Sequence, residues 1–392
     1  MRYRSIITLS VGHMVTDINQ GAVPALLPFL ISAYGLTYAA AAAVVFATNM
    51  SSSLVQPLFG HLADRISKPW LMPMGLVLAG AGLALAGGGP QLPAGALRRG
   101  SQRHRDCGLS PCEGARLVNA LAGARKATAL SLFGVGGQFG FAIGPVLTTF
   151  VVASFGLDGT LLLAVPAVSM ALVLAALHRA LFKGHSAASG LAAPSRGADG
   201  EDAWGPFGRL TAAAFFRAFA FYGFNTFLPL YFIDVLHQSK MTGGTAMTVF
   251  LGSGACGTLL GGRLGDRYGY RRVALIAFCF ATVLLPLFIG VHDVPISFLL
   301  LVPMGLVHFL SFSPIVVMGQ KFLPNRIGFA SGVTLGLSIS VGGIAAPIIG
   351  WLADIYGMQS AFMVMAVFPV IAGCLVLSLP GRHPATRPSF FG

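Results

Sequence analysis

The chain has 392 residues, of which 55% are hydrophobic and only 9% are charged, and its mean hydropathy is +0.78. Soluble domains carry about 25% charged residues, so this composition excludes them and indicates several membrane-spanning segments. The formal charge of +13 does not indicate a nucleic-acid partner, because the basic residues fall in short loops. The five cysteines have neither disulfide-framework nor zinc-site spacing, and we expect no metal and no cofactor.

Eleven apolar segments follow one another along the chain. They show no strand-like alternation, and lipid requires each segment to satisfy its own backbone, so we expect helices. The polar stretch 183–205, rich in Gly, Ala and Ser, predicts a flexible cytoplasmic linker. The expected helices cover residues 5–33, 37–60, 70–88, 127–153, 159–182, 206–236, 243–264, 272–291, 295–319, 327–353 and 356–380.

The first segment contains three polar residues, His13, Asp17 and Gln20, whose spacing places them on one helical face. Asp17 lies roughly 17 Å into the helix, near the middle of a bilayer, where a carboxylate is costly and usually functional. We interpret Asp17 as a proton carrier and His13 as its partner or a second titrating group. Gln20 would bind substrate or hold Asp17 in place. The alternative is a structural polar group that ties two helices together.

Lysine and arginine gather in alternate loops of the chain. Outside residues 91–112, the other set of loops contains only Lys240. The positive-inside rule therefore places the basic loops and both termini in the cytoplasm. Two cytoplasmic termini require an even number of spans, whereas eleven apolar segments are present.

The chain also repeats itself at an offset of about 202 residues. GHLADR at Gly60–Arg65 matches GRLGDR at Gly262–Arg267, and Pro145 matches Pro347. This repeat predicts an all-α membrane protein of twelve helices in two pseudo-twofold halves. We expect one half at 1–182, the linker at 183–205 and the other half at 206–392.

The missing span falls at residues 91–112, which contain Arg98, Arg99, Arg103 and Arg105. Each charge costs about 2.5–3.5 kcal/mol in a membrane helix, so this stretch cannot cross lipid. Because the 202-residue offset holds on both sides, we hypothesise two compensating frameshifts that have replaced the fourth helix. The alternative is a genuine basic insertion. Sequencing the gene in an independent isolate distinguishes them.

The two repeated loops resemble the signature of the major facilitator superfamily between helices 2 and 3 and between helices 8 and 9. The resemblance implies a transporter whose loop glycines allow close helix approach and whose loop acids face helix N-termini. The loop arginines would pair with acids on neighbouring helices in one state only, which biases a gate. The first copy lacks the usual basic run after its arginine. The expected gating residues are Gly60, Asp64, Arg65, Gly262, Asp266 and Arg267.

GFAIGP at Gly140–Pro145 resembles the glycine–proline motif of the fifth helix in antiporters of this superfamily. Gly140 and Gly144 would allow close helix packing, and Pro145 and Pro347 would bend their helices. The paired glycines that usually follow the proline are absent. Packing without meaning for transport is the alternative.

A narrower resemblance covers most of the chain. GHMVTDINQGAVPALLPFL in the first segment, EGARLVN at Glu113–Asn119 and ALSLFGVGGQFGFAIGP at Ala129–Pro145 resemble the fosmidomycin-resistance family of bacterial drug exporters. This resemblance implies proton-driven export of a small molecule from the cytoplasm to the periplasm of a bacterium. We expect the protein to lie in the inner membrane and to be a monomer. An uptake symporter of the same fold is the alternative. An enzyme is disfavoured because no nucleophile–base pair or metal cluster is evident.

The second half offers fewer polar residues within its segments. Arg217 and Asn225 lie nearly on one face of the helix that corresponds to the first, and Tyr222 lies between them. Four polar residues of this half are candidates for the transport pathway: Arg217, Tyr222, Asn225 and His308. The alternatives are that Arg217 extends to the cytoplasmic interface, that Tyr222 lies in the core, which is favoured, and that His308 is a packed core histidine. Glu113 and Arg116 are interpreted as partners of the first gating loop or as a solvated cluster.

Overall fold

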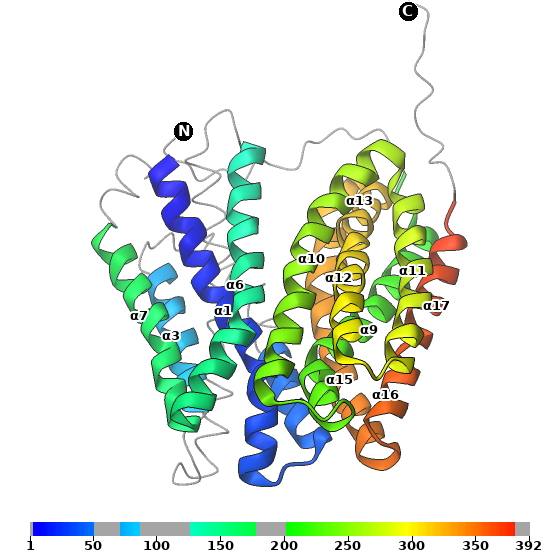
Figure 1. The fold of residues 1–392 in the computed structure, drawn as a ribbon. Coiled ribbons are helices and arrows are strands. Elements are labelled where there is room, and N and C mark those ends of the chain that lie inside the picture. The colour runs from blue at the N-terminus through cyan, green and yellow to red at the C-terminus, as the bar shows by residue number, and fades with distance from the viewer. Residues whose placement is uncertain (1–2, 51–70, 87–125, 178–200, 381–392) are drawn as a thin grey trace, which may run out of the picture.

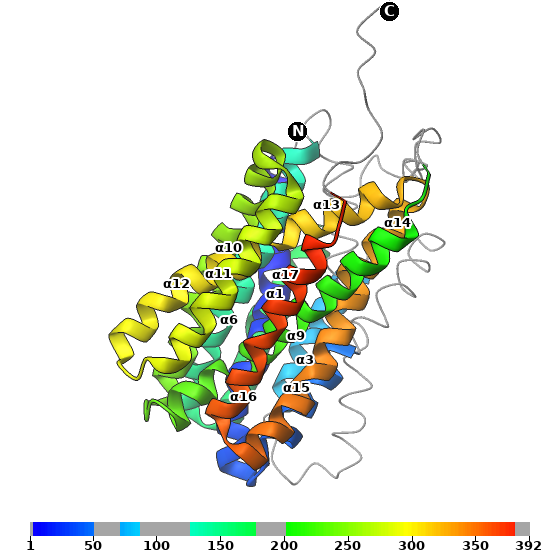
Figure 2. The same ribbon diagram turned by 90° about the vertical axis from the view of Figure 1, so that its right-hand side faces the viewer.

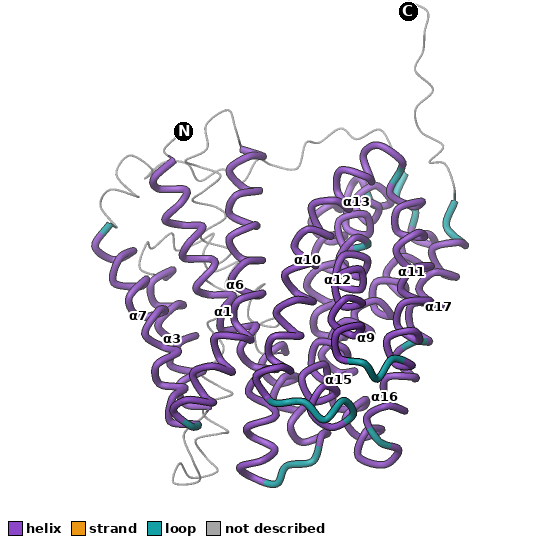
Figure 3. Tube along the Cα trace, viewed as in Figure 1, coloured by secondary structure: helices purple, strands orange, loops and turns teal. Residues whose placement is uncertain are grey.

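The computed structural model describes residues 3–50, 71–86, 126–177 and 201–380. Every regular element in these residues is helical (Figure 3). The predictions for residues 91–112 and for Gly60, Asp64, Arg65, Glu113 and Arg116 lie outside the described residues.

The helices lie close to the segments expected from hydropathy. Within the described residues, seven helices are long and apolar enough to cross a membrane, and the shorter helices Tyr38–Met50 and α3 are also apolar. The bounds are α1 (Tyr3–Tyr34), α3 (Leu71–Ala86), α6 (Lys126–Phe155), α7 (Thr160–Ala176), α9 (Trp204–Asp234), α10 (Lys240–Tyr268), α11 (Tyr270–Gly290), α12 (Val294–Leu310), α13 (Phe312–Phe322), α14 (Ile327–Ser331), α15 (Ser338–Tyr356), α16 (Met358–Met365) and α17 (Val367–Leu377).

Three of the expected helices are interrupted. The segment expected at 295–319 is divided at Ser311 into α12 and α13, and the last segment is divided at Ala366 into α16 and α17. A π-helical stretch, Gly332–Leu337, separates α14 from α15. Hydropathy alone does not predict these interruptions. Pro314 and Pro369 lie three residues after Ser311 and Ala366, and a proline has no N–H group to continue the helical hydrogen bonds.

Two groups of helices stand side by side (Figures 1 and 2). One group contains α1, α3, α6 and α7, and the other contains α9 to α17. The helices α6 and α10 converge at the lower end of Figure 1 and diverge toward the upper end, where α1 begins and α17 ends. We call the end where α1 begins and α17 ends the first end, and the opposite end the second end.

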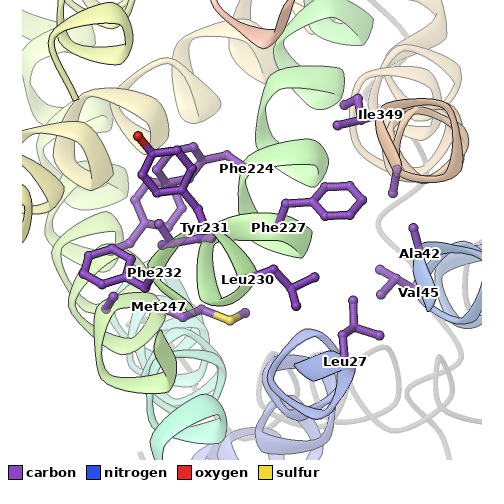
Figure 4. Close-up of a cluster of buried hydrophobic side chains, with 14 of the residues drawn as sticks. Leu27, Ala42, Val45, Phe224, Phe227, Leu230, Tyr231, Phe232, Met247 and Ile349 are labelled. Atoms are coloured by element: carbon purple, nitrogen blue, oxygen red, sulfur yellow. The ribbon is translucent and has the colours of Figure 1, made fainter. Parts of the chain in front are cut away.

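The buried apolar side chains are distributed differently at the two ends. At the second end, one cluster joins both groups: Leu27 from α1 and Val45 from helix Tyr38–Met50 pack with Phe227 and Leu230 of α9 (Figure 4). At the first end, each group has a core of its own, built around Leu9 and Phe133 in one group and around Leu210 and Ile315 in the other. Within the described residues, the two groups are therefore packed together at the second end and have separate cores at the first.

Candidate functional site

The polar residues of α1 form a pair inside the first group. His13 Nε2 lies 3.3 Å from Asp17 Oδ2, and the two side chains are only 15% and 16% exposed. On its other side, His13 Nδ1 lies 2.8 Å from the carbonyl oxygen of Phe133 in α6. The imidazole also stacks on the Phe133 ring, with 4.2 Å between centroids and 14° between planes. The histidine is therefore fixed from two directions, and its free nitrogen faces the acid.

The space for this pair exists because α6 has a glycine opposite it. A Cβ atom added at Gly137 would lie 2.5 Å from both Asp17 Oδ2 and His13 Cε1. Real Cβ atoms do not approach other atoms so closely, so any larger residue would displace the pair. Sequence reasoning missed both Gly137 and Phe133, because neither contact can be read without knowing how α6 packs on α1.

Around the pair, α1 and α6 run in parallel along a seam of glycines. Cβ atoms built at Gly136, Gly140 and Gly144 would lie 2.5, 2.0 and 2.5 Å from the carbonyl oxygens of Ser10, Met14 and Ile18. Lipid tails are as apolar as leucine, so close van der Waals contact rather than water exclusion holds such helices together. The geometry matches the packing expected of Gly140 and Gly144. Pro145 lies inside α6 and Pro347 inside α15, and both helices continue through them.

Gln20 does not join the pair. Its side chain is exposed, and no hydrogen bond links it to Asp17. It remains a candidate for substrate contact only. Among the described residues, no group of three His, Cys, Asp or Glu side chains could hold a metal ion.

A second polar cluster lies in the other group. Arg217 of α9 and His308 of α12 line the same pocket, together with Ser311. The Arg217 guanidinium lies 5.3 Å from the centre of the Phe312 ring, and the His308 ring stacks on Phe221 at 5.2 Å. Neither Arg217 Nε nor His308 Nε2 has a hydrogen-bond partner, although both atoms are buried. The structure therefore brings these two predicted residues together.

Tyr222 and Asn225 lie elsewhere on α9. The Tyr222 ring packs against Gly342 of α15, where an added Cβ would lie 2.4 Å from it. Asn225 is 2% exposed, and its Oδ1 atom has no partner. Neither side chain lines the pocket of Arg217 and His308.

Polar contacts cross between the two groups at the second end. Asp354, near the end of α15, accepts hydrogen bonds from the backbone N–H groups of Tyr38 at 2.7 Å and Ala39 at 3.0 Å. Its carboxylate thus caps the first turn of helix Tyr38–Met50, where the partial positive charge of a helix favours it. The Tyr38 hydroxyl donates to Asp234 Oδ2 at 2.8 Å, and Lys240 contacts the Ser32 hydroxyl.

Sequence reasoning missed this set of contacts, although a signal was present. Gly350 and Asp354 repeat the Gly-x-x-x-Asp spacing of the two gating loops. In the structure, Gly350 lies against the backbone of Tyr38 and Ala39, where an added Cβ would be only 2.8 Å away. The glycine permits the close approach that lets the aspartate reach the helix N-terminus.

The described gating loop at the first end makes only local contacts. Asp266 accepts a hydrogen bond from the hydroxyl of Tyr270, and the Arg267 guanidinium lies 5.2 Å from the centre of the neighbouring Tyr268 ring. The close helix contact expected at Gly262 is absent, since a Cβ there would meet nothing within 4 Å. Its neighbour Gly261 makes that contact instead, 2.3 Å from the Leu310 carbonyl oxygen. The prediction of a close helix contact at Gly262 was therefore wrong by one residue, because Gly261 is the glycine that faces α12.

Helices of bilayer length, two packed groups and buried polar clusters within them define a multi-pass membrane transporter. The family model described as the Major Facilitator Superfamily matches residues 9–347 and again 210–390, so the chain belongs to this superfamily. It is a transporter and not an enzyme.

Known relatives agree with this assignment. The chain is 28% identical to the fosmidomycin resistance protein of Escherichia coli (strain K12), over 96% of this chain and 92% of that one. It is also 28% identical to the uncharacterized MFS-type transporter YfnC of Bacillus subtilis (strain 168), over 96% and 93%. A solved bacterial homolog of the human lysosomal transporter Spinster, inward-facing and occupied, superposes with a TM-score of 0.76 at 14% identity, covering 96% of both chains. The predicted resemblance to the fosmidomycin-resistance family and the predicted fold are thus confirmed.

Proposed function

We propose that this transporter is a proton-coupled antiporter that exports a small drug-like molecule by alternating access. The observation that carries the proposal is the His13–Asp17 pair, held in the middle of a membrane helix by a carbonyl and a glycine of α6. An ionisable pair at this depth is expensive to bury and is expected to serve transport.

The geometry makes the pair a one-proton device. A carbonyl oxygen can only accept, so the short contact with Phe133 requires a hydrogen on His13 Nδ1. The other nitrogen, Nε2, then attracts Asp17 only if one further proton lies on Nε2 or on the carboxyl group. Without that proton, two electron-rich atoms would face each other at 3.3 Å. Loss of one proton therefore changes the pair from attractive to repulsive, which couples protonation to the packing of α1 on α6.

The uneven packing of the two ends supports alternating access. Shared core and cross-group contacts at the second end, with separate cores at the first, are what a state closed on one side requires. In the described residues, Lys240 is the only Lys or Arg at the second end, whereas Arg209, Arg271 and Arg326 lie at the first. By the positive-inside rule, the first end is cytoplasmic and this state is open to the cytoplasm. The similarity to an inward-facing structure is consistent with this orientation.

The remaining parts of the proposal follow from the sequence. The two six-helix halves would span 1–182 and 206–392, joined by the cytoplasmic linker 183–205, with both termini in the cytoplasm. The location would be the inner membrane of a bacterium, and the transporter would act as a monomer. Export of fosmidomycin is proposed from the similarity to the resistance protein of Escherichia coli. A proton-coupled uptake symporter is the alternative within the same fold.

Proton release tests the coupling role. Fosmidomycin, added to the purified wild-type transporter in weakly buffered solution, should displace protons, and Asp17→Asn should release none. The matched control is Asp158→Asn, which removes an exposed acid at the second end and should leave the release unchanged. Equal release from wild type and Asp17→Asn would refute the role of Asp17.

Vesicle transport separates the antiporter from the symporter. In inside-out membrane vesicles with an acidic interior, an exporter driven by proton exchange should accumulate fosmidomycin. A symporter should accumulate it only when the gradient is reversed. Accumulation with the reversed gradient alone would overturn export.

A further inference from the structure

The cluster of Arg217 and His308 is not used by the proton mechanism. Arg217 lies about 20 Å along α9 from its start at Trp204, within the membrane-spanning part of the helix. If its side chain extended to the cytoplasmic interface, its nitrogens would reach water or headgroups. Instead, Nε is buried without a partner, and the guanidinium lies over Phe312. The interface explanation therefore does not account for its position.

The surroundings of this cation contain no counter-charge. In the described part of the chain, neither the Arg217 guanidinium nor the His308 imidazole makes an ion pair or a hydrogen bond. Apart from Ser311, the other residues that line their pocket are apolar, with Ala277, Phe278 and Pro369 among them. A second pocket adjoins the first and shares His308 and Pro369 with it. Arg217 is partly buried, its Nε atom is fully buried without a partner, and a cation in such a place without a counter-charge is unfavourable, so the site as described is incomplete.

Water could accept hydrogen bonds from this cation but could not neutralise its charge, whereas an anionic group would do both. The planar fork of Arg matches the two oxygens of a carboxylate or phosphate, and His308 supplies another nitrogen toward the same pocket.

The helix geometry gives a second, independent indication. Ser311 lines the pocket at the point where α12 ends and α13 begins. Transporters commonly build substrate sites where a membrane helix is interrupted.

We propose that Arg217 and His308 bind a single oxyanion group, of the carboxylate or phosphate type, in the pocket beside the α12–α13 junction. The group belongs either to the transported molecule or to a free inorganic anion that serves as a resident counter-ion. Its assignment to the transported molecule rests on the function proposed above; the site itself does not.

Thermal unfolding of the purified full-length protein tests the site, with inorganic phosphate as the probe and potassium chloride at equal ionic strength as the reference. Phosphate should raise the unfolding temperature of wild type by a few degrees. Arg217→Lys keeps the charge and should retain part of the shift, while Arg217→Gln should lose it. An equal shift in wild type and Arg217→Gln, or no shift in wild type, would overturn the proposal.

The stability of Arg217→Gln without phosphate provides a second readout. Because the substitution removes an unpaired buried charge, its unfolding temperature should equal or exceed that of wild type. A lower value would mean that Arg217 already has a stabilising partner, which contradicts an incomplete site. This readout also shows that any loss of the phosphate shift is not caused by misfolding.

Transport measurements then assign the source of the anion. If the oxyanion is part of the substrate, phosphate should slow fosmidomycin transport competitively, and Arg217→Lys should weaken that inhibition. Transport that is insensitive to phosphate would overturn the assignment to the substrate and leave the resident anion. Asp17→Asn should keep the full phosphate shift, so failure of the proton mechanism and failure of this site are distinguishable.

Discussion

The helices α1 and α9 occupy corresponding places in the two groups, yet they carry opposite charges at nearly the same depth. Asp17 lies eleven residues before Pro28, and Arg217 lies twelve residues before Pro229. The acid has a histidine one turn away and a neighbouring helix that fixes this histidine. The cation has a histidine from another helix beside it and, among the described residues, no counter-charge. A repeated fold can thus divide its chemistry between its halves, with the proposed proton site complete in one half and the proposed anion site open in the other.

The largest effect should come from removing the charge of Asp17 and, in a separate variant, the charge of Arg217. Asp17→Asn should lower proton-driven transport to background, a loss of at least about 100-fold, because in the described residues His13 is then left without the acid with which it shares a proton. Substrate binding should change by less than about threefold. Arg217→Gln should show the opposite division, with weakened binding and an unchanged number of protons released per substrate bound. Equilibrium binding and proton release on the same samples check both, and similar profiles for the two variants would abolish the distinction between the halves.

The next largest effect is expected at the glycine seam, where α6 packs on α1 beside the His13–Asp17 pair. Gly140→Ala would place a methyl group 2.0 Å from the Met14 carbonyl oxygen, so α6 would have to move. We expect a destabilisation of about 2 kcal/mol or more, the range typical of overpacked sites. Gly134→Ala is the matched control on the same helix, because nothing lies within 4 Å of its Cβ, and it should stay within about 0.5 kcal/mol of wild type. Unfolding in a denaturant series measures both, and equal stabilities would show that α1 and α6 are not in contact as described.

Much of this fold could be predicted from the sequence, because a segment that crosses lipid must be long, apolar and hydrogen-bonded within itself. The helix α1 was expected at 5–33 and is found at Tyr3–Tyr34, since the apolar run ends where the membrane does. The His13–Asp17 contact was expected from a spacing of four on one helix. These predictions depend on local geometry alone.

The rest depends on packing between helices, which no local pattern records. The Phe133 carbonyl and Gly137 are 120 or more residues from the pair that they hold. The interruption at Ser311 is marked in the sequence by Pro314, three residues later, but hydropathy alone does not show it. Asp354 lies one residue beyond the expected helix 327–353, and its role is visible only from its contact with Tyr38. Sequence reasoning thus located the charges but not the groups that complete them.

A third prediction concerns the closed second end. Asp354→Ala removes a helix cap that links the two groups, whereas Asp293→Ala removes a cap of similar length within one group, where Asp293 accepts from Ile296 N–H at 3.0 Å. Each cap contributes about 0.5–2 kcal/mol, so the first variant should shift the population toward the state open at the second end by roughly 2- to 30-fold. The second should change stability alone. Distances between spin labels at the ends of helix Tyr38–Met50 and α15, in a cysteine-free background, measure the shift. Equal distance distributions in the two variants would show that the Asp354 contact does not hold this end closed.

The smallest effect is expected at the gating loop of the first end. Asp266 contacts only the Tyr270 hydroxyl in the described residues, on an exposed surface, so Asp266→Asn should change the free energy of unfolding by less than about 0.5 kcal/mol. If this acid caps a helix in the opposite state, as Asp354 does in the present one, the substitution should destabilise that state selectively. Turnover should then fall about two- to fivefold while substrate affinity remains within a factor of two. Tyr270→Phe is the matched control, because it removes the present contact and leaves the acid free for the other state, and it should keep wild-type turnover. A loss in Tyr270→Phe equal to that in Asp266→Asn would place the function of this loop in the state described here and not in its opposite.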